Sequence, residues 1–574
     1  TRRHRPSARA GGRNPNMMGP EIEFDRVSDS DDGVRVKKGR CHNLTRRQRN
    51  LYISIVVVAV FIIAVFAVFV GVDDTSNPDS ESWLFPGYHV RPARHWINDP
   101  NGPFVITTRD GPKYHLFMQY NPASTVWGKI SWAHLVSADM VQWEELGVAL
   151  KPDESYDEFG VWSGSATIVA GKPVLLYTCA SQDGKIQQQC SATQAEDTDV
   201  YAVKWVKSSS NPIIANPPPG CPADMFRDPT TAWKDPQGRW CILLGASVTN
   251  MTQPYNGTAS AALYTSTDFS SWTFQKYLYQ SGEQDFMMEC PDLFPLPDSS
   301  LYALKYSIMR TRRDYVVVGT YDPSTHTFSV VSDSPQLLDP GPLYASKSFL
   351  DTQSGRRILW GWLPEEDAPA RAAKRGWAGT MSLPRVLRLD PTTNTSVLAA
   401  PLADLDQLRQ GSLFDSSLSM APGEFRSLDG VSSMQYEVLA TMDTPPPSAG
   451  QLCAEFAVLS DDDRQVFVLV SVCRPGSDNS LWTLTVDRSS GNVETPHTSY
   501  SSTFHVSEDV ISLRVFVDRS VVEAYAQDGR AVVSARVYPN PAQLRLFAAL
   551  RHTAWNMRVR VFDMGSAKAP PGTV

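Results

Sequence analysis

Short apolar strands dominate the hydrophobic pattern after residue 85. Alternating or continuous apolar runs are bounded by Gly, Pro, Asp and Ser, and helical periodicity is scarce. A polar turn followed by an apolar strand recurs five times, with equivalent positions at Lys113, Lys172, Arg239, Leu301 and Arg357. The intervals of 59, 67, 62 and 56 residues are too long for helical repeats. They predict the four-stranded blades of a β-propeller with long connections.

A different pattern begins near residue 412. Alternating runs such as QYEVLATMD, ISLRVFVD and QLRLFAAL are typical of an antiparallel β-sandwich, and APLADLDQLRQ before them predicts a short helix. We therefore predict an all-β protein, with a five-bladed β-propeller followed by a C-terminal β-sandwich. The predicted parts are the propeller over 86–400, a linker helix over 401–411, the sandwich over 412–565 and a flexible tail over 566–574.

Residues 51–72 form an uncharged apolar run of 22 positions. This run is long enough to cross a bilayer as a helix and longer than the apolar core of an ordinary signal peptide. Residues 1–50 contain 13 Lys and Arg against 6 Asp and Glu, which predicts a cytosolic basic tail and a lumenal body after a linker or propeptide over 73–85. A long, cleaved signal peptide is the alternative. We expect the anchor to be removed in the mature protein, so that the membrane is contacted only before processing.

Charge and sequons indicate the compartment and exclude one class of partner. The net charge of −8 leaves about −15 for the chain after residue 50, which argues against a nucleic-acid partner and suits a neutral substrate in an acidic compartment. Three N-glycosylation sequons, at Asn250, Asn256 and Asn394, agree with passage through a secretory lumen.

Seven of the eight cysteines follow the apolar run, so at least one lumenal thiol is unpaired. None shows CxxC or Cys/His zinc spacing, and we expect neither a metal nor an organic cofactor. Cys453 and Cys473 lie at the outer ends of two strand-like runs and form the best disulfide candidate. Cys179 and Cys190 are a weaker candidate for closing a hairpin.

Three acidic motifs containing proline could carry chemistry: NDPNG around Asp99, FRDPTTAW around Asp228 and MMECPDLF around Glu289. Their separations of 129 and 61 residues are about two repeats and one repeat. Because the inner strands of all blades converge on one axis, the three carboxylates can meet there. Two carboxyl groups flanking a glycosidic bond suffice to hydrolyse or transfer a sugar, and burial or a neighbouring carboxylate should raise the pKa of the acid. The alternative is that all three are turn residues.

In this order, the three motifs resemble the signatures of glycoside hydrolase family 32, the β-fructofuranosidases. The stretches VWSGSATI, LYASKSF, RRILWGW and RGWAGTMSLPR resemble that family too, and the leader resembles its plant vacuolar branch. The resemblance covers residues 85–565 and implies a five-bladed propeller with a sandwich. It also implies delivery through the secretory pathway to the vacuole lumen.

The resemblance implies a role for each acidic residue. Asp99 would be the nucleophile, Glu289 the acid and base, and Asp228 the stabiliser of the transition state. Retention of configuration would place the Asp99 and Glu289 carboxyl groups about 5 Å apart. The positions that match substrate contacts, the last of them for the glucose part of sucrose, are Asn98, Gln119, Trp127, Trp162, Ser163, Arg227 and Asp339.

Departures from the vacuolar hydrolases suggest which molecule accepts the fructosyl group. Lys129 stands where those hydrolases usually carry Asn, Ile97 where they carry Met, and Pro342 changes the segment after Asp339. Trp96 argues the other way, since several plant fructosyltransferases replace that Trp. We predict a sucrose fructosyltransferase with residual hydrolysis, acting on sucrose and fructan oligosaccharides and forming β-2,6 linkages. The alternatives are an acid invertase and a catalytically silent sugar-binding protein.

Overall fold

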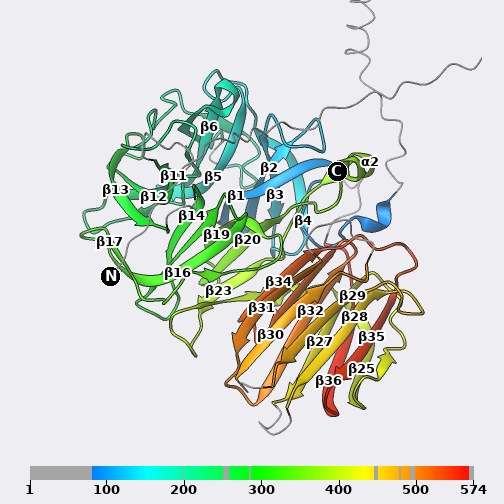
Figure 1. Cartoon of the computed structure of the whole chain (residues 1–574). Helices are drawn as coiled ribbons and strands as arrows, with labels where there is room; N and C mark the ends of the chain where they lie inside the picture. The colour runs from blue at the N-terminus through cyan, green and yellow to red at the C-terminus, as the bar shows by residue number, and fades with distance from the viewer. Residues whose placement is uncertain are drawn as a thin grey trace, which may run out of the picture. The chain divides into compact units, whose positions relative to one another are not determined.

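The computed structural model describes residues 81–567, except 197, 250–256, 283–285, 445–449, 477–479 and 492–497. Five sheets arranged as blades are followed by two six-stranded sheets (Figure 1). The described part of the chain is therefore all-β, as the strand pattern predicts. The predicted anchor over 51–72 and the sequons at Asn250 and Asn256 lie outside the described residues, whereas Asn394 lies in an exposed turn. Within the described ranges, no helix has the length and apolarity needed to span a bilayer.

Each of the five sheets is one blade, and the positions of the repeat in the sequence fall within two residues of the start of a strand that is paired on both sides in its blade. The five-bladed prediction is thus confirmed. Blade I contains β1 (His95–Thr108), β2 (Gly111–Asn121), β3 (Ser131–Ser137) and β4 (Trp143–Leu150). Blade II contains β5 (Gly160–Val169), β6 (Lys172–Ser181), β7 (Ile186–Gln194) and β8 (Trp205–Lys207). Blade III contains β9 (Phe226–Arg227), β10 (Trp233–Lys234), β11 (Trp240–Val248), β12 (Thr258–Ser266) and β13 (Thr273–Gln280). Blade IV contains β14 (Met288–Pro295), β15 (Tyr302–Ile308), β16 (Arg313–Asp322), β17 (Thr327–Val330) and β18 (Gln336–Leu337). Blade V contains β19 (Tyr344–Asp351), β20 (Arg356–Leu363), β22 (Thr380–Met381), β23 (Arg385–Leu389) and β24 (Val397–Pro401).

A short segment after helix α2 (Pro369–Arg375) joins the last blade to the first. β21 (Trp377–Ala378) pairs in parallel with β1, and β22 pairs with β20 of blade V. Gly379 lies between them with φ +84°, and a Cβ there would lie 2.4 Å from the carbonyl oxygen of Ile97. Only glycine fits this conformation and this close approach. The segment therefore closes the ring of blades directly behind the strand that carries Asp99.

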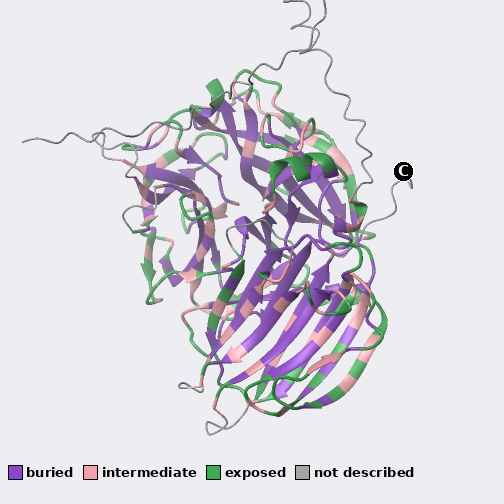
Figure 2. Ribbon diagram, turned by 45° about the vertical axis from the view of Figure 1, so that its right-hand side comes forward, coloured by how far each residue is buried: buried purple, intermediate pink, exposed green. Residues whose placement is uncertain are grey.

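The sandwich encloses a continuous apolar core between its two sheets, and Figure 2 shows buried residues along these strands. The 3₁₀-helix η3 (Ala403–Leu408) replaces the predicted linker helix, and the first sandwich strand begins three residues before the predicted 412. The remaining elements are η1 (Ser82–Leu84), η2 (Gln182–Gly184), β25 (Arg409–Met420), β26 (Phe425–Ser427), β27 (Gln435–Asp443), β28 (Leu452–Ser460), β29 (Val468–Arg474), β30 (Leu481–Asp487), β31 (Ser499–His505), β32 (Val510–Asp518), β33 (Val521–Ala526), β34 (Ala531–Arg536), β35 (Arg545–Arg551) and β36 (Trp555–Met564).

Two disulfides cross-link neighbouring strands. Cys453 and Cys473 lie opposite one another in β28 and β29 and are bonded, as the strand pattern predicts. Cys179 of β6 and Cys190 of β7 form the second disulfide, which the sequence favoured less. The remaining cysteines in the described part of the chain, Cys221, Cys241 and Cys290, are buried free thiols.

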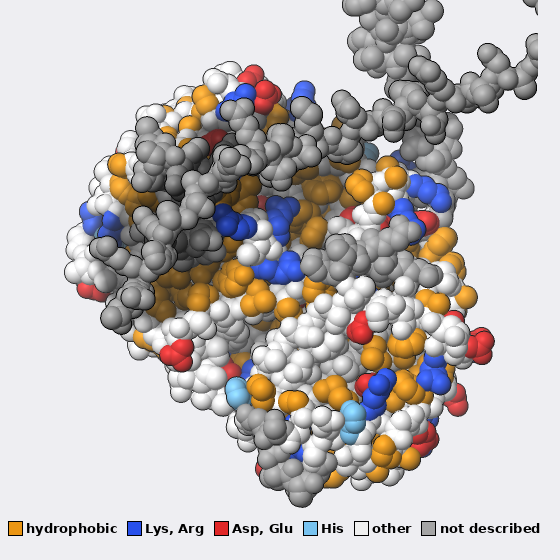
Figure 3. Space-filling model, viewed as in Figure 1, with side chains coloured by type: hydrophobic (Ala, Val, Ile, Leu, Met, Phe, Trp, Pro, Cys, Tyr) orange, Lys and Arg blue, Asp and Glu red, His pale blue; other side chains and the backbone are white. Residues whose placement is uncertain are grey.

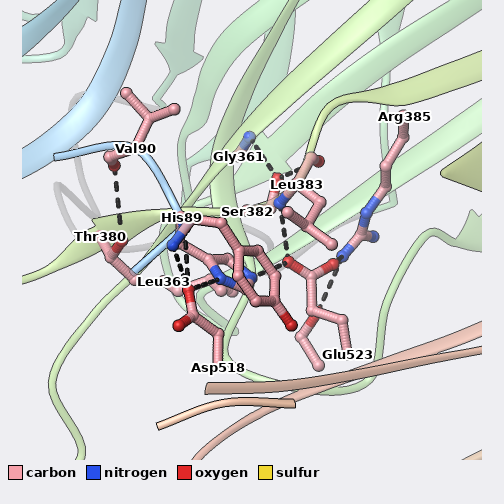
Figure 4. Close-up of polar contacts among 12 residues, drawn as sticks. His89, Val90, Gly361, Leu363, Thr380, Ser382, Leu383, Arg385, Asp518 and Glu523 are labelled. Carbon is pink, nitrogen blue, oxygen red and sulfur yellow. Dashed lines mark hydrogen bonds and ion pairs between the residues drawn. The ribbon is translucent and has the colours of Figure 1, made fainter. Parts of the chain in front are cut away.

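A buried polar cluster joins the propeller to the sandwich (Figure 4). His89, just before blade I, contacts Asp518 of the sandwich through Nδ1 at 2.8 Å and Glu523 through Nε2 at 3.1 Å. Arg385 of blade V donates from Nη2 to Glu523 at 2.8 Å. A buried charge is tolerated only when it is paired. The two domains must therefore meet in the arrangement that brings these partners together.

The pKa values in this cluster predict greatest stability in mild acid. Although burial opposes it, contact with Asp518 and Glu523 raises the pKa of His89 above 6.5. This contribution is complete below 6.5 and is lost as the pH rises through the folded-state pKa. Burial also opposes ionisation of Glu523, but Arg385 and His89 lower its pKa to about 2 from an ordinary 4.5. Both contributions are therefore present between about pH 4.5 and 6.5.

We expect His89→Gln to lower the free energy of unfolding by about 3–5 kcal/mol at pH 5.5, because Asp518 and Glu523 each lose one buried partner, the charged imidazole. The variant should also lose the decline in stability that the wild type shows above pH 6.5. Denaturant titrations across this pH range measure both effects. His505→Gln, at an exposed position, is the control and should retain the wild-type profile. If the stability of His89→Gln still falls above pH 6.5 as in the wild type, His89 is not the group that causes the fall.

Candidate active site

A cavity of about 470 Å³ opens where the blades converge. In Figure 3, basic side chains lie among apolar ones near the middle of the propeller face. All five blades or the connections between them supply its lining residues. These are Trp96, Asn98, Asp99, Gln119, Trp127, Trp162, Asp183, Gly184, Lys185, Gln187, Asp224, Met225, Arg227, Asp228, Glu289, Met309, Arg312, Tyr344 and Trp362.

The structure brings the three carboxylates of the acidic motifs into this one cavity. Asp99 lies in β1 where the pairing with β2 shifts between Ile97 and Pro100. Glu289 lies at a similar shift in β14, and Asp228 follows β9 with φ +68°. Because an irregular pairing re-aims a side chain, the turn-forming residues of these motifs direct each carboxylate toward the axis.

Asp99 is held by three donors. Ser163 Oγ donates to its Oδ2 at 2.5 Å, Asn98 Nδ2 donates to its Oδ1 at 3.0 Å, and the Cys290 thiol lies 3.7 Å from Oδ2. Gln119 Oε1 accepts from the same Asn98 amide at 2.9 Å and so fixes its orientation. Burial raises the pKa of Asp99 and the Glu289 charge adds to this, while the bonds from Ser163 and Asn98 oppose it. These donors hold the carboxylate in a fixed orientation.

Asp228 is bonded mainly to its backbone surroundings. Its Oδ2 accepts from the backbone N–H of Cys290 at 2.9 Å, and its own N–H donates to Thr178 Oγ1 at 2.9 Å. Burial raises the pKa of Asp228 to about 6; Arg227 opposes the rise and Glu289 adds to it. The pKa of Asp228 therefore lies above that of an exposed aspartate.

Glu289 is paired with a cation. Arg227 donates to its Oε1 from Nη2 at 2.6 Å and from Nε at 3.0 Å, and the Tyr344 hydroxyl donates to its Oε2. Burial favours the neutral form of Glu289, but Arg227 and Tyr344 together lower its pKa. The expectation of a raised pKa for this acid is thus wrong for the free pocket, because a two-pronged guanidinium contact outweighs burial.

Aromatic rings line two parts of the cavity. Trp127 lies 5.8 Å from Trp162 and 5.9 Å from Phe159, measured between ring centroids. Trp96 lies 5.6 Å from Trp362, and its indole N–H donates to Asn98 Oδ1 at 2.8 Å. Flat apolar faces with a few fixed polar groups are typical of a sugar pocket.

Comparisons with known proteins agree with this geometry. The family description "Glycosyl hydrolases family 32 N-terminal domain" matches residues 89–401, and "Glycosyl hydrolases family 32 C terminal" matches residues 404–561. The chain belongs to glycosyl hydrolases family 32. As a family 32 member it is a glycoside hydrolase, an enzyme acting on fructosides.

Relatives and solved structures in family 32 cover most of the chain. An acid β-fructofuranosidase of Phaseolus vulgaris is 34% identical over 85% of this chain and 81% of its own length. The vacuolar acid β-fructofuranosidase 2 of a Rosa hybrid cultivar is 31% identical over 87% and 85%. Fructan 1-exohydrolase IIa of Cichorium intybus, solved with 1-kestose, superposes with a TM-score of 0.74 at 29% identity, over 85% of this chain and 99% of that one.

Two residues predicted to shape the substrate site lie elsewhere in this family 32 structure. Asp339 is fully buried at the contact with the sandwich, where its Oδ2 accepts from Arg385 Nη2 at 2.9 Å and from Ser534 Oγ at 2.8 Å. Its assignment to the glucose part of sucrose is corrected, because the carboxylate is already committed to an arginine. Pro342 is buried in the same segment, away from the pocket lining.

Two further acceptor candidates lie outside the lining. Ile97 is 1% exposed and packs in the apolar core. Lys129 is exposed in the loop that carries Trp127, with φ +42°. Trp96 alone among the four acceptor candidates lines the cavity, while Ser163 reaches it through its bond to Asp99.

Several lining residues carried no assigned role in the sequence. Tyr344 and Trp362 lie within LYASKSF and RRILWGW, so the family resemblance contained a signal for them. Arg312 lies in a hairpin turn without any motif, and its place at the cavity follows only from the pairing of β15 with β16. Cys290 contacts both Asp99 and Asp228 through its thiol, and burial keeps its pKa well above the usual value, so the thiol remains protonated.

One group of side chains in the described ranges has the spacing of metal ligands: Asp235, Cys241 and His326. Arg239 Nε donates to Asp235 Oδ2 at 2.8 Å, and Arg239 Nη2 lies 3.3 Å from His326 Nε2. The guanidinium thus already occupies the place of a cation, and we assign no metal to this group.

The Tyr344 hydroxyl provides a test of the site electrostatics. Tyr344→Phe removes a hydrogen bond that lowers the pKa of Glu289, so this pKa should rise and the alkaline limb of kcat/KM for a fructoside should move to higher pH. Rate measurements between pH 3 and 8 would check this. Tyr315→Phe, in the neighbouring blade IV and outside the cavity lining, should retain the wild-type limb. A limb that moves to lower pH would contradict the assignment.

Proposed function

We propose that this protein cleaves sucrose and short fructans by double displacement with retention of configuration. The observation that carries the proposal is the convergence of Asp99, Asp228 and Glu289 on one cavity. Asp99 attacks the anomeric carbon of the fructosyl unit and forms a covalent intermediate, while Glu289 gives its proton to the departing glucosyl oxygen. Glu289 then takes a proton from the incoming water or hydroxyl, which releases Asp99. A separation of about 5 Å between the two carboxyl groups remains part of the proposal.

The surroundings of the carboxylates suit these steps. Ser163 and Asn98 hold Asp99 in one orientation, as a nucleophile requires. Asp228 lies where it can accept from the fructose hydroxyls and stabilise the positive charge of the transition state. Because Arg227 and Tyr344 lower the pKa of Glu289, its protonated form is favoured by acid or by weakening of this pair when substrate binds.

The lining supports a neutral substrate. Five carboxylates and three basic side chains face the cavity, so an anionic ligand would meet net negative charge. The volume of about 470 Å³ is that of a small-molecule site. The relatives are named acid and vacuolar β-fructofuranosidases, and the Cichorium enzyme was solved with 1-kestose. We extend these substrates and the vacuole lumen to this chain as part of the proposal.

Fructosyl transfer to a sugar is the second candidate function. Trp127 is 44% exposed at the cavity and packs edge-on against Trp162, and Lys129 follows two residues later in the same loop. This half-exposed ring offers a face on which an acceptor sugar could stack. Two other positions behind the transferase prediction, Ile97 and Pro342, are buried, which weakens it. Trp96, the residue usual in hydrolases, argues against it as before. A β-2,6 linkage remains part of this second proposal.

Product analysis at high sucrose separates the two candidates. Hydrolysis gives glucose and fructose in equal amounts, whereas transfer gives an excess of glucose and a trisaccharide whose linkage can be read by NMR. If Lys129 assists the acceptor, Lys129→Asn should reduce the trisaccharide about threefold or more at an unchanged rate of glucose release. Equal glucose and fructose at every sucrose concentration would exclude the transferase. Lys172→Asn, at an exposed turn of blade II, is the control.

Replacement of the nucleophile tests the chemistry itself. We expect Asp99→Ala to lower kcat on sucrose by about 10³-fold or more, because no covalent intermediate can form. Circular dichroism would verify the fold, and Asp110→Ala, at an exposed turn of the same blade, should keep wild-type turnover. Equal turnover by Asp99→Ala and the wild type would refute the assignment of the nucleophile.

A further inference from the structure

Asp228 has a backbone conformation that its own strand does not impose. Its φ of +68° is in the left-handed region, which is uncommon for a residue other than glycine. β9, the strand that leads into Asp228, consists of Phe226 and Arg227 and pairs on one edge with β11 of the same blade. A residue keeps such a conformation when its surroundings hold it there. The groups that bond the other edge of β9 are therefore important for the placement of Asp228.

Side chains of blade II bond this segment in a closed ring of hydrogen bonds. The N–H of Asp228 donates to Thr178 Oγ1 at 2.9 Å, and the Thr178 hydroxyl donates to Gln189 Oε1 at 2.9 Å. The Gln189 amide then donates from Nε2 to the carbonyl oxygen of Phe226 at 3.1 Å. The ring thus begins at Asp228 and returns to the same segment at Phe226, with both side chains of blade II fully buried.

The pairing of β6 with β7 explains why Thr178 and Gln189 meet. The two residues lie directly opposite one another in these strands. Because side chains alternate between the faces of a strand, the next residues, Cys179 and Cys190, lie on the other face, where they form the disulfide. The disulfide therefore cross-links the two strands beside the ring and keeps Thr178 opposite Gln189.

A second glutamine of β7 completes the support of β9. Gln187 lies two residues before Gln189 on the same face of β7. Its Oε1 accepts from the N–H of Phe226 at 3.2 Å and from Arg227 Nη1 at 3.0 Å. The two glutamine amides thus bond both the N–H and the carbonyl of Phe226, as a neighbouring strand would. Blade II in this way supplies the second partner of β9 through side chains.

We propose that Thr178 and Gln189 are positioning residues for catalysis, because they hold the backbone of Asp228 so that its carboxylate stays within reach of the fructosyl unit. The inference rests on the proposed function, in which Asp228 stabilises the transition state. Asp228 is held at two points, its carboxylate by the N–H of Cys290 and its backbone by Thr178. Loss of the second point lets the residue turn about the first, and a displacement of about 1 Å lowers a rate by roughly a hundredfold.

Thr178→Val removes the hydroxyl, keeps the shape of the side chain and so breaks the ring. We expect kcat on sucrose to fall about 10- to 100-fold while KM changes by less than about threefold, because the lost interaction acts in the transition state. Thr178→Ser keeps the hydroxyl and should retain at least about a third of the wild-type kcat. If Thr178→Val does not fold, Gln189→Met decides the question and should lower kcat about 3- to 10-fold.

Thr167→Val is the matched control. Thr167 lies in β5 of the same blade, is buried, and accepts at Oγ1 from the N–H of Ala232 at 2.8 Å. The variant therefore removes an equally buried hydroxyl between the same two blades, at a residue outside the cavity lining. It should lower stability in a denaturant titration as Thr178→Val does, and keep kcat within about twofold of the wild type.

A double-mutant cycle separates the positioning of Asp228 from a general effect on the fold. In an Asp228→Ala background, Thr178→Val should lower kcat by less than about a further twofold, because the carboxylate that it positions is already absent. The full loss in that background would overturn the role of the ring, as would an unchanged kcat in Thr178→Val. An equal loss in Thr167→Val, or a Thr178→Ser variant as slow as Thr178→Val, would overturn it too. Wild-type turnover by Asp228→Ala, or no cleavage of sucrose by the wild type, would instead refute the proposed function.

Discussion

Three carboxyl groups share one buried cavity, and their mutual repulsion is the constraint around which the rest of the site is arranged. Arg227 offsets the charge of Glu289, the hydroxyl and amide of Ser163 and Asn98 satisfy Asp99, and Asp228 keeps the raised pKa. These partners come from different blades, so the charges stay buried only while the blades remain in register. The buried charges of the site are therefore paired only when the propeller is closed.

The sequence predicted the architecture and the three carboxylates because both are periodic features. The apolar strands repeat at about sixty residues, and the acidic motifs keep that spacing, so their convergence follows from the fold class. The sequence misplaced Asp339, because its partners Arg385 and Ser534 lie far along the chain in another blade and in the sandwich. Single-sequence patterns do not encode which buried carboxylate finds which arginine. The predicted rise in the pKa of Glu289 is wrong for the same reason. The sequence indicates that Glu289 is buried, but it does not indicate that two N–H groups of Arg227 donate to it.

The sandwich contributes charge to the propeller, although none of its described residues lines the cavity. Glu523 accepts from the backbone N–H of Leu383, just after the ring-closing segment, and from Arg385. The same carboxylate contacts His89 at the entry to blade I. One sandwich side chain therefore touches the first and last parts of the propeller. This arrangement gives the second domain a physical role in the active site without direct contact with substrate.

The parallel pairing of β21 with β1 also has a consequence for synthesis of the chain. The strand that bears the nucleophile leaves the ribosome about 280 residues before Trp377 and Ala378, its partners on that edge. Until those residues emerge, one edge of β1 has no strand to pair with, and Glu289 is itself made nearly 200 residues after Asp99. A nascent chain thus cannot assemble a working pocket part-way through translation. Catalytic competence is acquired late, in the step that turns an open row of blades into a ring.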